Sequence, residues 1–129
     1  MKVIYAHACD YAAILSDSNP IISGIFQGFK SLKPAKRSFQ VIFNTEIYRG
    51  ETLPIKINGV VINPSDKEIS RTEIIAKSKG IMISGEKEYF GAVLNFKDVD
   101  FSENGAYIIK LSIDDKPSHE MTIDFTLLA

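Results

Sequence analysis

The sequence predicts an all-β fold, an immunoglobulin-like (Greek-key) β-sandwich of eight to nine strands. Apolar and polar side chains alternate along much of the chain, which is the period of strands with one buried face. Turn-forming segments recur at intervals of about 8–12 residues, as in sandwiches and barrels. Gly105 and Tyr107 follow a polar turn with the spacing of a tyrosine corner, in which the ring packs inward and its hydroxyl reaches nearby backbone. The 129 residues are predicted to form one β-sandwich domain, 1–129.

The N-terminal third predicts a pair of strands. Residues 3–15 are rich in β-branched and aromatic side chains, a turn with Ser, Asp and Pro follows, and an apolar run resumes over residues 21–29. Gly24 and Gly28 within the second run indicate a bulge, or a place where another backbone or a large aromatic ring comes close. A short basic turn over residues 33–37 is expected to close the pair.

Later strands are predicted wherever apolar side chains keep the same parity. The residues that share an inward face are Phe39, Val41 and Phe43; Ile55, Ile57 and Val61; Phe90, Ala92, Leu94 and Phe96; Tyr107, Ile109, Leu111 and Ile113; and Met121, Ile123, Phe125 and Leu127. The last two sets lie on either side of a turn over residues 114–117 and predict a long antiparallel hairpin with one solvated face.

The segment 66–79 allows two interpretations. Ser65 and Glu68 match a helix capping box, and Gly80 could end a helix. The segment has too few apolar residues for a continuous buried stripe, however, and Pro64 fits the second position of a β-turn. The pattern favours a strand, with one short helix near 66–79 as the alternative.

Composition narrows the classes of function. The 15 Lys and Arg residues balance 16 Asp and Glu residues, so nothing predicts a nucleic-acid binder. A single Cys excludes an intramolecular disulfide and a Cys-based zinc site. No apolar run approaches the ~20 residues that span a bilayer and no secretory signal is evident, so we expect a cytoplasmic protein without membrane contact. No nucleotide-binding, serine-hydrolase or zinc-protease motif occurs, and no cofactor is predicted.

Cys9 and His7 form the one local cluster of reactive side chains. A Cys–His pair can supply a thiolate nucleophile, which is the basis of an alternative function as a thiol-dependent enzyme. On one strand, however, side chains two residues apart lie about 6–7 Å from each other, too far for a hydrogen bond. Cys9 is therefore expected to be a small buried apolar residue rather than a nucleophile.

A basic cluster and the aromatic side chains are the remaining candidates for binding. Lys33, Lys36 and Arg37, with Lys30, could bind a small anion or RNA, although such charges in a turn usually form a solvated loop. The eight Phe and five Tyr residues could include a surface platform for sugars or peptides, but most alternate as core residues do. An all-β domain also has sheet edges, and pairing of two copies through a free edge predicts a homodimer.

These observations predict a non-catalytic binding or structural module rather than an enzyme. Its expected partner is another protein or a second copy of the chain, and the candidate binding residues are Cys9, His7, Lys33, Lys36 and Arg37. The alternatives are a thiol-dependent enzyme that uses Cys9 and His7, or carbohydrate or peptide recognition through an aromatic face or a sheet edge.

Several short motifs spread over most of the chain resemble an uncharacterised family of short prokaryotic proteins, known only as a domain of unknown function. They are C-D-Y-A at residues 9–12, G-I-F at residues 24–26, the N-P-S-D-K turn at residues 63–67 and G-x-Y at residues 105–107. The sequence departs from the family pattern at Asp66, where Gly is usual, and at Gln27, where Asp is usual. The resemblance implies a β-sandwich of bacterial or phage origin with no assigned activity or catalytic residues. The non-catalytic module predicted above is expected to serve as an accessory subunit of a bacterial or phage assembly.

Overall fold

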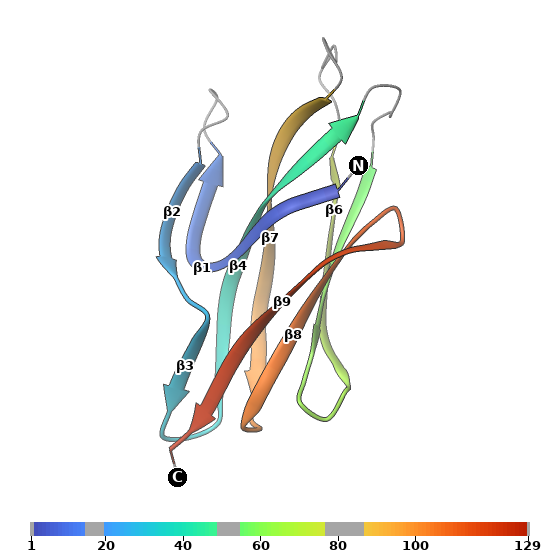
Figure 1. The fold of residues 1–129 in the computed structure, drawn as a ribbon. Helices are drawn as coiled ribbons and strands as arrows, with labels where there is room; N and C mark the ends of the chain where they lie inside the picture. The colour runs from blue at the N-terminus through green and yellow to red at the C-terminus, as the bar shows by residue number, and fades with distance from the viewer. Residues whose placement is uncertain (1, 15–19, 49–54, 77–86, 129) are drawn as a thin grey trace.

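The computed structural model describes residues 2–14, 20–48, 55–76 and 87–128, and within these ranges the backbone forms nine strands and no helix (Figure 1). The strands are β1 (Lys2–Ile14), β2 (Pro20–Ile25), β3 (Gly28–Ser31), β4 (Ala35–Tyr48), β5 (Ile55–Ile62), β6 (Glu68–Ala76), β7 (Lys87–Phe101), β8 (Gly105–Ile113) and β9 (Lys116–Leu127). The all-β prediction is confirmed. The described ranges contain no helix that could cross a membrane.

The strands form two sheets that pack face to face. One sheet has the order β2-β1-β4-β7 and the other has the order β3-β9-β8-β5-β6. Neighbouring strands are antiparallel except β3 and β9, which run parallel. The chain crosses between the sheets five times, from β2 to β3, β3 to β4, β4 to β5, β6 to β7 and β7 to β8. This is the Greek-key arrangement of immunoglobulin domains, so the predicted sandwich is confirmed with nine strands.

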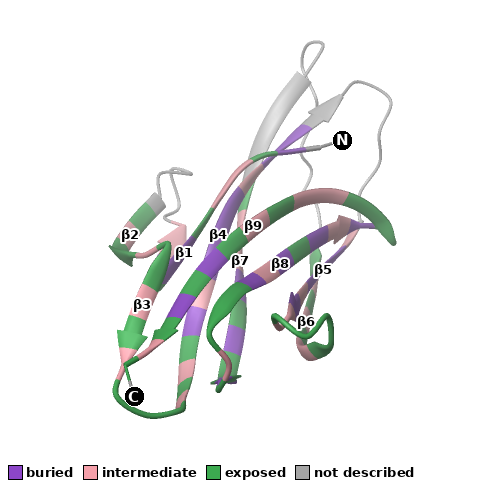
Figure 2. Cartoon of the chain, turned by 60° about the horizontal axis from the view of Figure 1, so that its bottom comes forward, coloured by how far each residue is buried: buried purple, intermediate pink, exposed green. Residues whose placement is uncertain are grey.

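The core lies between the two sheets and follows the predicted alternation, which Figure 2 shows as buried and exposed residues taking turns along β8 and β9. Gly59 of β5 lies under this core, where a Cβ atom would be 2.6 Å from Cζ of Phe96 and 2.9 Å from Cδ1 of Leu94. A side chain there would collide with the opposite sheet, so glycine lets the sheets approach.

The corner between β7 and β8 has the predicted geometry. Tyr107 is fully buried, and its hydroxyl oxygen accepts hydrogen bonds from the backbone N–H groups of Ser102 at 3.1 Å and Glu103 at 3.0 Å. The same hydroxyl donates to the carbonyl of Glu103 at 3.0 Å. One side chain therefore provides hydrogen-bond partners for three backbone groups of a turn, where no neighbouring strand pairs with them. This confirms the tyrosine corner.

The helix alternative for residues 66–79 is wrong over Glu68–Ala76, which form the strand β6 paired antiparallel with β5. The two residues of the supposed capping box bond elsewhere, since Ser65 Oγ contacts Glu103 at 2.7 Å and Glu68 pairs with Arg71 at 2.6 Å. As a strand, this segment forms a ladder of backbone hydrogen bonds with the side of β5 that β8 leaves free. A short helix with little apolar surface would gain less stabilisation than this pairing gives. Residues 77–79 lie outside the described ranges.

The turn before β6 places Asp66 in a left-handed conformation. Asp66 has a φ of +65°, and its N–H donates to the carbonyl of Asn63 at 2.9 Å. The Asn63 side chain also accepts from the N–H groups of Ser65 and Lys67. The left-handed conformation favours glycine, and Asp is among the residues that tolerate it.

The predicted second strand is divided in two. β2 pairs with β1, the chain then changes sheets at Phe26 and Gln27, and β3 pairs with β9. At Gly28 a Cβ atom would lie 2.7 Å from the carbonyl oxygen of Asp124, so another backbone does come close at this glycine, as expected. The predicted basic turn is shorter than expected, because β4 begins at Ala35.

Candidate functional site

A sharp bend in β1 shapes the outer face of the first sheet (Figure 1). β1 pairs with β4 up to Cys9 and with β2 from Cys9 onward. Beyond the bend, the N–H of Ala12 donates to Oε1 of Gln40 on β4 at 2.6 Å. The side chain of Ile14 packs against Gly91 on β7, so closely that a Cβ atom added to Gly91 would lie 2.8 Å from Cδ1 of Ile14. The hairpin of β1 and β2 therefore lies over the outer face of β4 and β7.

This hairpin buries a second, small apolar cluster on the outer face. Its members are Cys9, Ala12 and Ile42, with Ile14, Ile22 and Val93 packed against them. Alternation along β4 places Val41 and Phe43 in the main core and turns Ile42 away from it. The sequence signal for this cluster was the uninterrupted apolar run of residues 41–43. Period-two alternation explains the two inward side chains of this run but not the apolar Ile42 between them.

Cys9 and His7 lie in different surroundings. Cys9 is 0% exposed, its thiol contacts the carbonyl of Gln40 at 3.5 Å, and burial, followed by the charge of Asp10, raises the pKa of the thiol. His7 is exposed and its ring lies 5.6 Å from that of Tyr5. A raised pKa favours the neutral thiol, which is a poor nucleophile. This environment gives no support to the alternative of a thiol-dependent enzyme.

His7 instead borders a surface pocket of about 380 Å³ between β1 and β9. The pocket is lined by Ala6, His7, Ile25, Phe26, Gln27, Met121, Thr122 and Asp124. Cys9 does not line it. Across the described ranges, no group of three or more His, Cys, Asp or Glu residues is placed to hold a metal ion.

Arg37 of the predicted basic cluster makes its contacts within the fold. The Arg37 guanidinium lies over two aromatic rings, 3.8 Å from the centroid of Phe26 and 4.6 Å from that of Phe29, and donates to Asp10 at 2.8 Å. Its charge thus joins β1, β3 and β4. Lys33 in the turn and Lys36 on β4 are exposed, and a binding role for them stays a prediction.

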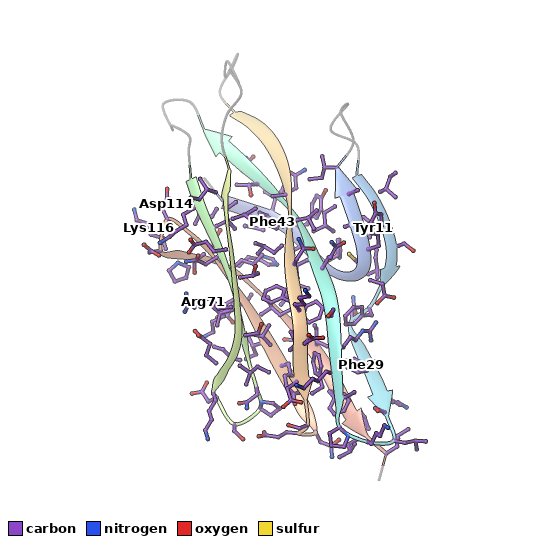
Figure 3. The ribbon with its side chains drawn as sticks, turned by 180° about the vertical axis from the view of Figure 1, so that it is seen from behind. Tyr11, Phe29, Phe43, Arg71, Asp114 and Lys116 are labelled. Atoms are coloured by element: carbon purple, nitrogen blue, oxygen red, sulfur yellow. The ribbon has the colours of Figure 1, made fainter. Side chains whose placement is uncertain are left out.

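A surface groove of about 450 Å³ with a mixed polar and aromatic lining lies beside the β1–β2 hairpin, on the outer face of the first sheet. It is lined by Asp10, Tyr11, Ser38, Phe39, Gln40, Asn95, Phe96 and Lys97. Sequence reasoning missed this groove because it combines three segments far apart in the chain. Figure 3 shows Tyr11 on the hairpin side of the molecule, opposite Arg71 on β6.

Three of the four edge strands are protected against pairing. β7 carries a bulge where Lys97 and Asp98 together oppose Ser38, and Asp98 has a φ of +49°. β6 exposes the charged residues Glu68 and Arg71, and β3 exposes Lys30. Bulges and charges each discourage the addition of another strand.

β2 differs from the other edge strands in its side chains. Its sequence, P-I-I-S-G-I, contains no charged residue, and the side chains of Ile21 and Ile25 are 47% and 55% exposed. Among the described strands, only β1 pairs with β2. The opposite side of β2 therefore presents backbone groups and apolar side chains together.

Comparison with known proteins assigns a family. Residues 4–126 match a family described as "Family of unknown function (DUF6941)". No curated protein matches the chain.

Solved structures with a similar arrangement are distant. An immunoglobulin-like protein from Pseudomonas aeruginosa has a TM-score of 0.35 and 11% identity, with 94% of this chain and 96% of that chain covered. A β-glucuronidase from glycoside hydrolase family 2 has a TM-score of 0.41 and 11% identity, with 75% of this chain covered. A glycosyl hydrolase family 2 member from Bacteroides cellulosilyticus DSM 14838 has a TM-score of 0.39 and 13% identity, with 83% of this chain covered. This chain corresponds to 11% and 18% of the lengths of the two hydrolases.

Proposed function

We propose that this chain, which belongs to the DUF6941 family of unknown function, is a non-catalytic binding module that associates with a second copy of itself through β2. The contrast between β2 and the three protected edge strands carries the proposal. An open edge is a template for strand addition. A self-pairing sandwich also suits an accessory subunit of a bacterial or phage assembly, the origin implied by the resemblance of the motifs.

The composition of β2 fits two-fold pairing. In an antiparallel pair of identical strands, each side chain meets one from the same strand, so a charge would often meet a like charge. β2 carries none. Residues 21–23 form the pairing segment, because Pro20 has no N–H and Gly24 turns the backbone with a φ of +70°. Ile21 and Ile25 supply apolar surface at the seam.

Light scattering coupled to size exclusion tests the proposal. The chain is expected to elute as a dimer that dissociates on dilution. Replacing Ile21 or Ile25 by Lys puts like charges at the seam, and each substitution is expected to raise the dimer dissociation constant by at least about tenfold.

Ile75→Lys is the matched control, since Ile75 is 58% exposed on β6, an edge that is already charged. It is expected to leave the mass unchanged. A chain that stays monomeric up to its solubility limit overturns the proposal, and so does a dimer that Ile75→Lys weakens as strongly as Ile21→Lys.

A further inference from the structure

We infer that the mixed polar and aromatic groove beside the β1–β2 hairpin is a binding site for a neutral saccharide. This site is separate from the β2 edge, because the groove lies on the face of the sheet and is built by β1, β4 and β7. Its lining combines an exposed aromatic ring, two side-chain amides and a pair of opposite charges.

A chain of hydrogen bonds orients the amides. Oε1 of Gln40 accepts from the backbone N–H of Ala12 at 2.6 Å, so the Nε2 group of Gln40 points the other way and donates to Oδ1 of Asn95. Nδ2 of Asn95 makes no hydrogen bond to any residue that the structure describes. Because a primary amide carries two N–H donors, Asn95 offers both to a ligand in a fixed direction.

The charges of the groove favour a neutral ligand. The carboxylate of Asp10 is already paired with Arg37 at 2.8 Å, and Lys97 is the side chain of opposite charge in the lining. A strongly charged ligand would meet both signs. Sugar hydroxyls, in contrast, both donate and accept, so they complement the Asn95 amide and the carboxylate oxygens of Asp10.

Tyr11 supplies the apolar contact that a sugar ring needs. Its side chain is 54% exposed and borders the groove. The C–H face of a pyranose stacks on an aromatic ring of this kind while its hydroxyls point to the side, where the amides lie. An aromatic residue with few rotatable bonds provides this surface at low entropic cost.

Between β4 and β7 the groove floor offers no free backbone groups to a ligand. Gln40 pairs with Asn95 and Phe39 with Phe96 in the ladder that joins these two strands. Over this part of the floor a ligand is recognised by side chains, as sugars are, and a neutral peptide is the competing ligand in the test below.

Titration of the full chain with cellotetraose, xylotetraose, mannotetraose and maltotetraose, followed by NMR chemical shifts, tests the inference. At least one is expected to bind and to shift the signals of Tyr11 and Asn95. Tyr11→Ala and Asn95→Asp are each expected to weaken binding by at least about tenfold, because one removes the stacking surface and the other removes both amide donors. Tyr11→Phe keeps the ring and is expected to retain binding.

Asn104→Asp is the matched control for Asn95→Asp. Asn104 is an exposed amide outside the groove whose Oδ1 accepts from the N–H of Leu127, so the substitution makes the same change of charge and keeps the acceptor. Thermal melting confirms that each variant folds. Absence of binding to all four sugars overturns the inference, as does equal loss in Asn104→Asp, or tighter binding of tetragalacturonate or of a neutral peptide.

Discussion

Removing the Tyr107 hydroxyl should destabilise the sandwich measurably. In Tyr107→Phe the ring still fills its buried site, but the N–H groups of Ser102 and Glu103 and the carbonyl of Glu103 lose their partner. A buried polar group left without a partner costs about 1–3 kcal/mol. Ser102 is exposed, so water can replace its bond. The two remaining groups, both of Glu103, are only partly buried, so each loses about 1 kcal/mol, the lower end of this range, and together they lose about 2 kcal/mol.

Urea unfolding measures this loss. With a typical slope of about 2 kcal/mol per molar for a chain of this size, the midpoint of Tyr107→Phe is expected about 1 M below that of the unmodified chain. Tyr5→Phe is the control, because the Tyr5 hydroxyl makes no hydrogen bond to the described residues. A Tyr107→Phe variant within about 0.5 kcal/mol of the unmodified chain would refute the reasoning, as would an equal loss in Tyr5→Phe.

Two further predictions concern stability and the thiol. Asp66→Gly is expected to stabilise the chain by about 0.5–1 kcal/mol in thermal melts, because position 66 has a positive φ, whereas Asp66→Ala should not. The raised pKa of Cys9 means that the unfolded chain ionises first, near the ordinary thiol value of 9.0. The free energy of unfolding should therefore decrease as the pH rises above this value. Cys9→Ala should remove the part of this pH dependence that comes from the thiol. Rapid alkylation of Cys9 in the native chain would contradict the buried, neutral thiol.

The β1–β2 hairpin connects the two proposed sites. Its edge presents the apolar strand β2, and its body forms one wall of the groove through Asp10 and Tyr11. Arg37 holds the hairpin by pairing with Asp10 and lies over Phe26 and Phe29, at the point where the chain changes sheets. This explains why a basic residue that the sequence suggested for ligand binding is used for positioning instead.

The sequence by itself determined the strands, the core faces and the tyrosine corner. These features depend on neighbours one to five residues apart, so the period-two alternation of residues such as Ile109 and Leu111 carries the information locally. The same is true of the β8–β9 hairpin, whose turn and flanking alternation lie together in the chain.

Only the tertiary structure decided how the strands combine. Residues 68–76 had a helix cap signal nearby, and pairing with β5 made them a strand. The single run 21–29 became two strands because β1 and β9 lie in different sheets and each offered a partner. The groove required Tyr11, Gln40 and Asn95 to meet across long sequence separations. Local patterns state which face of a strand is buried, but they do not state which strand will cover it, since that depends on the packing of the whole chain.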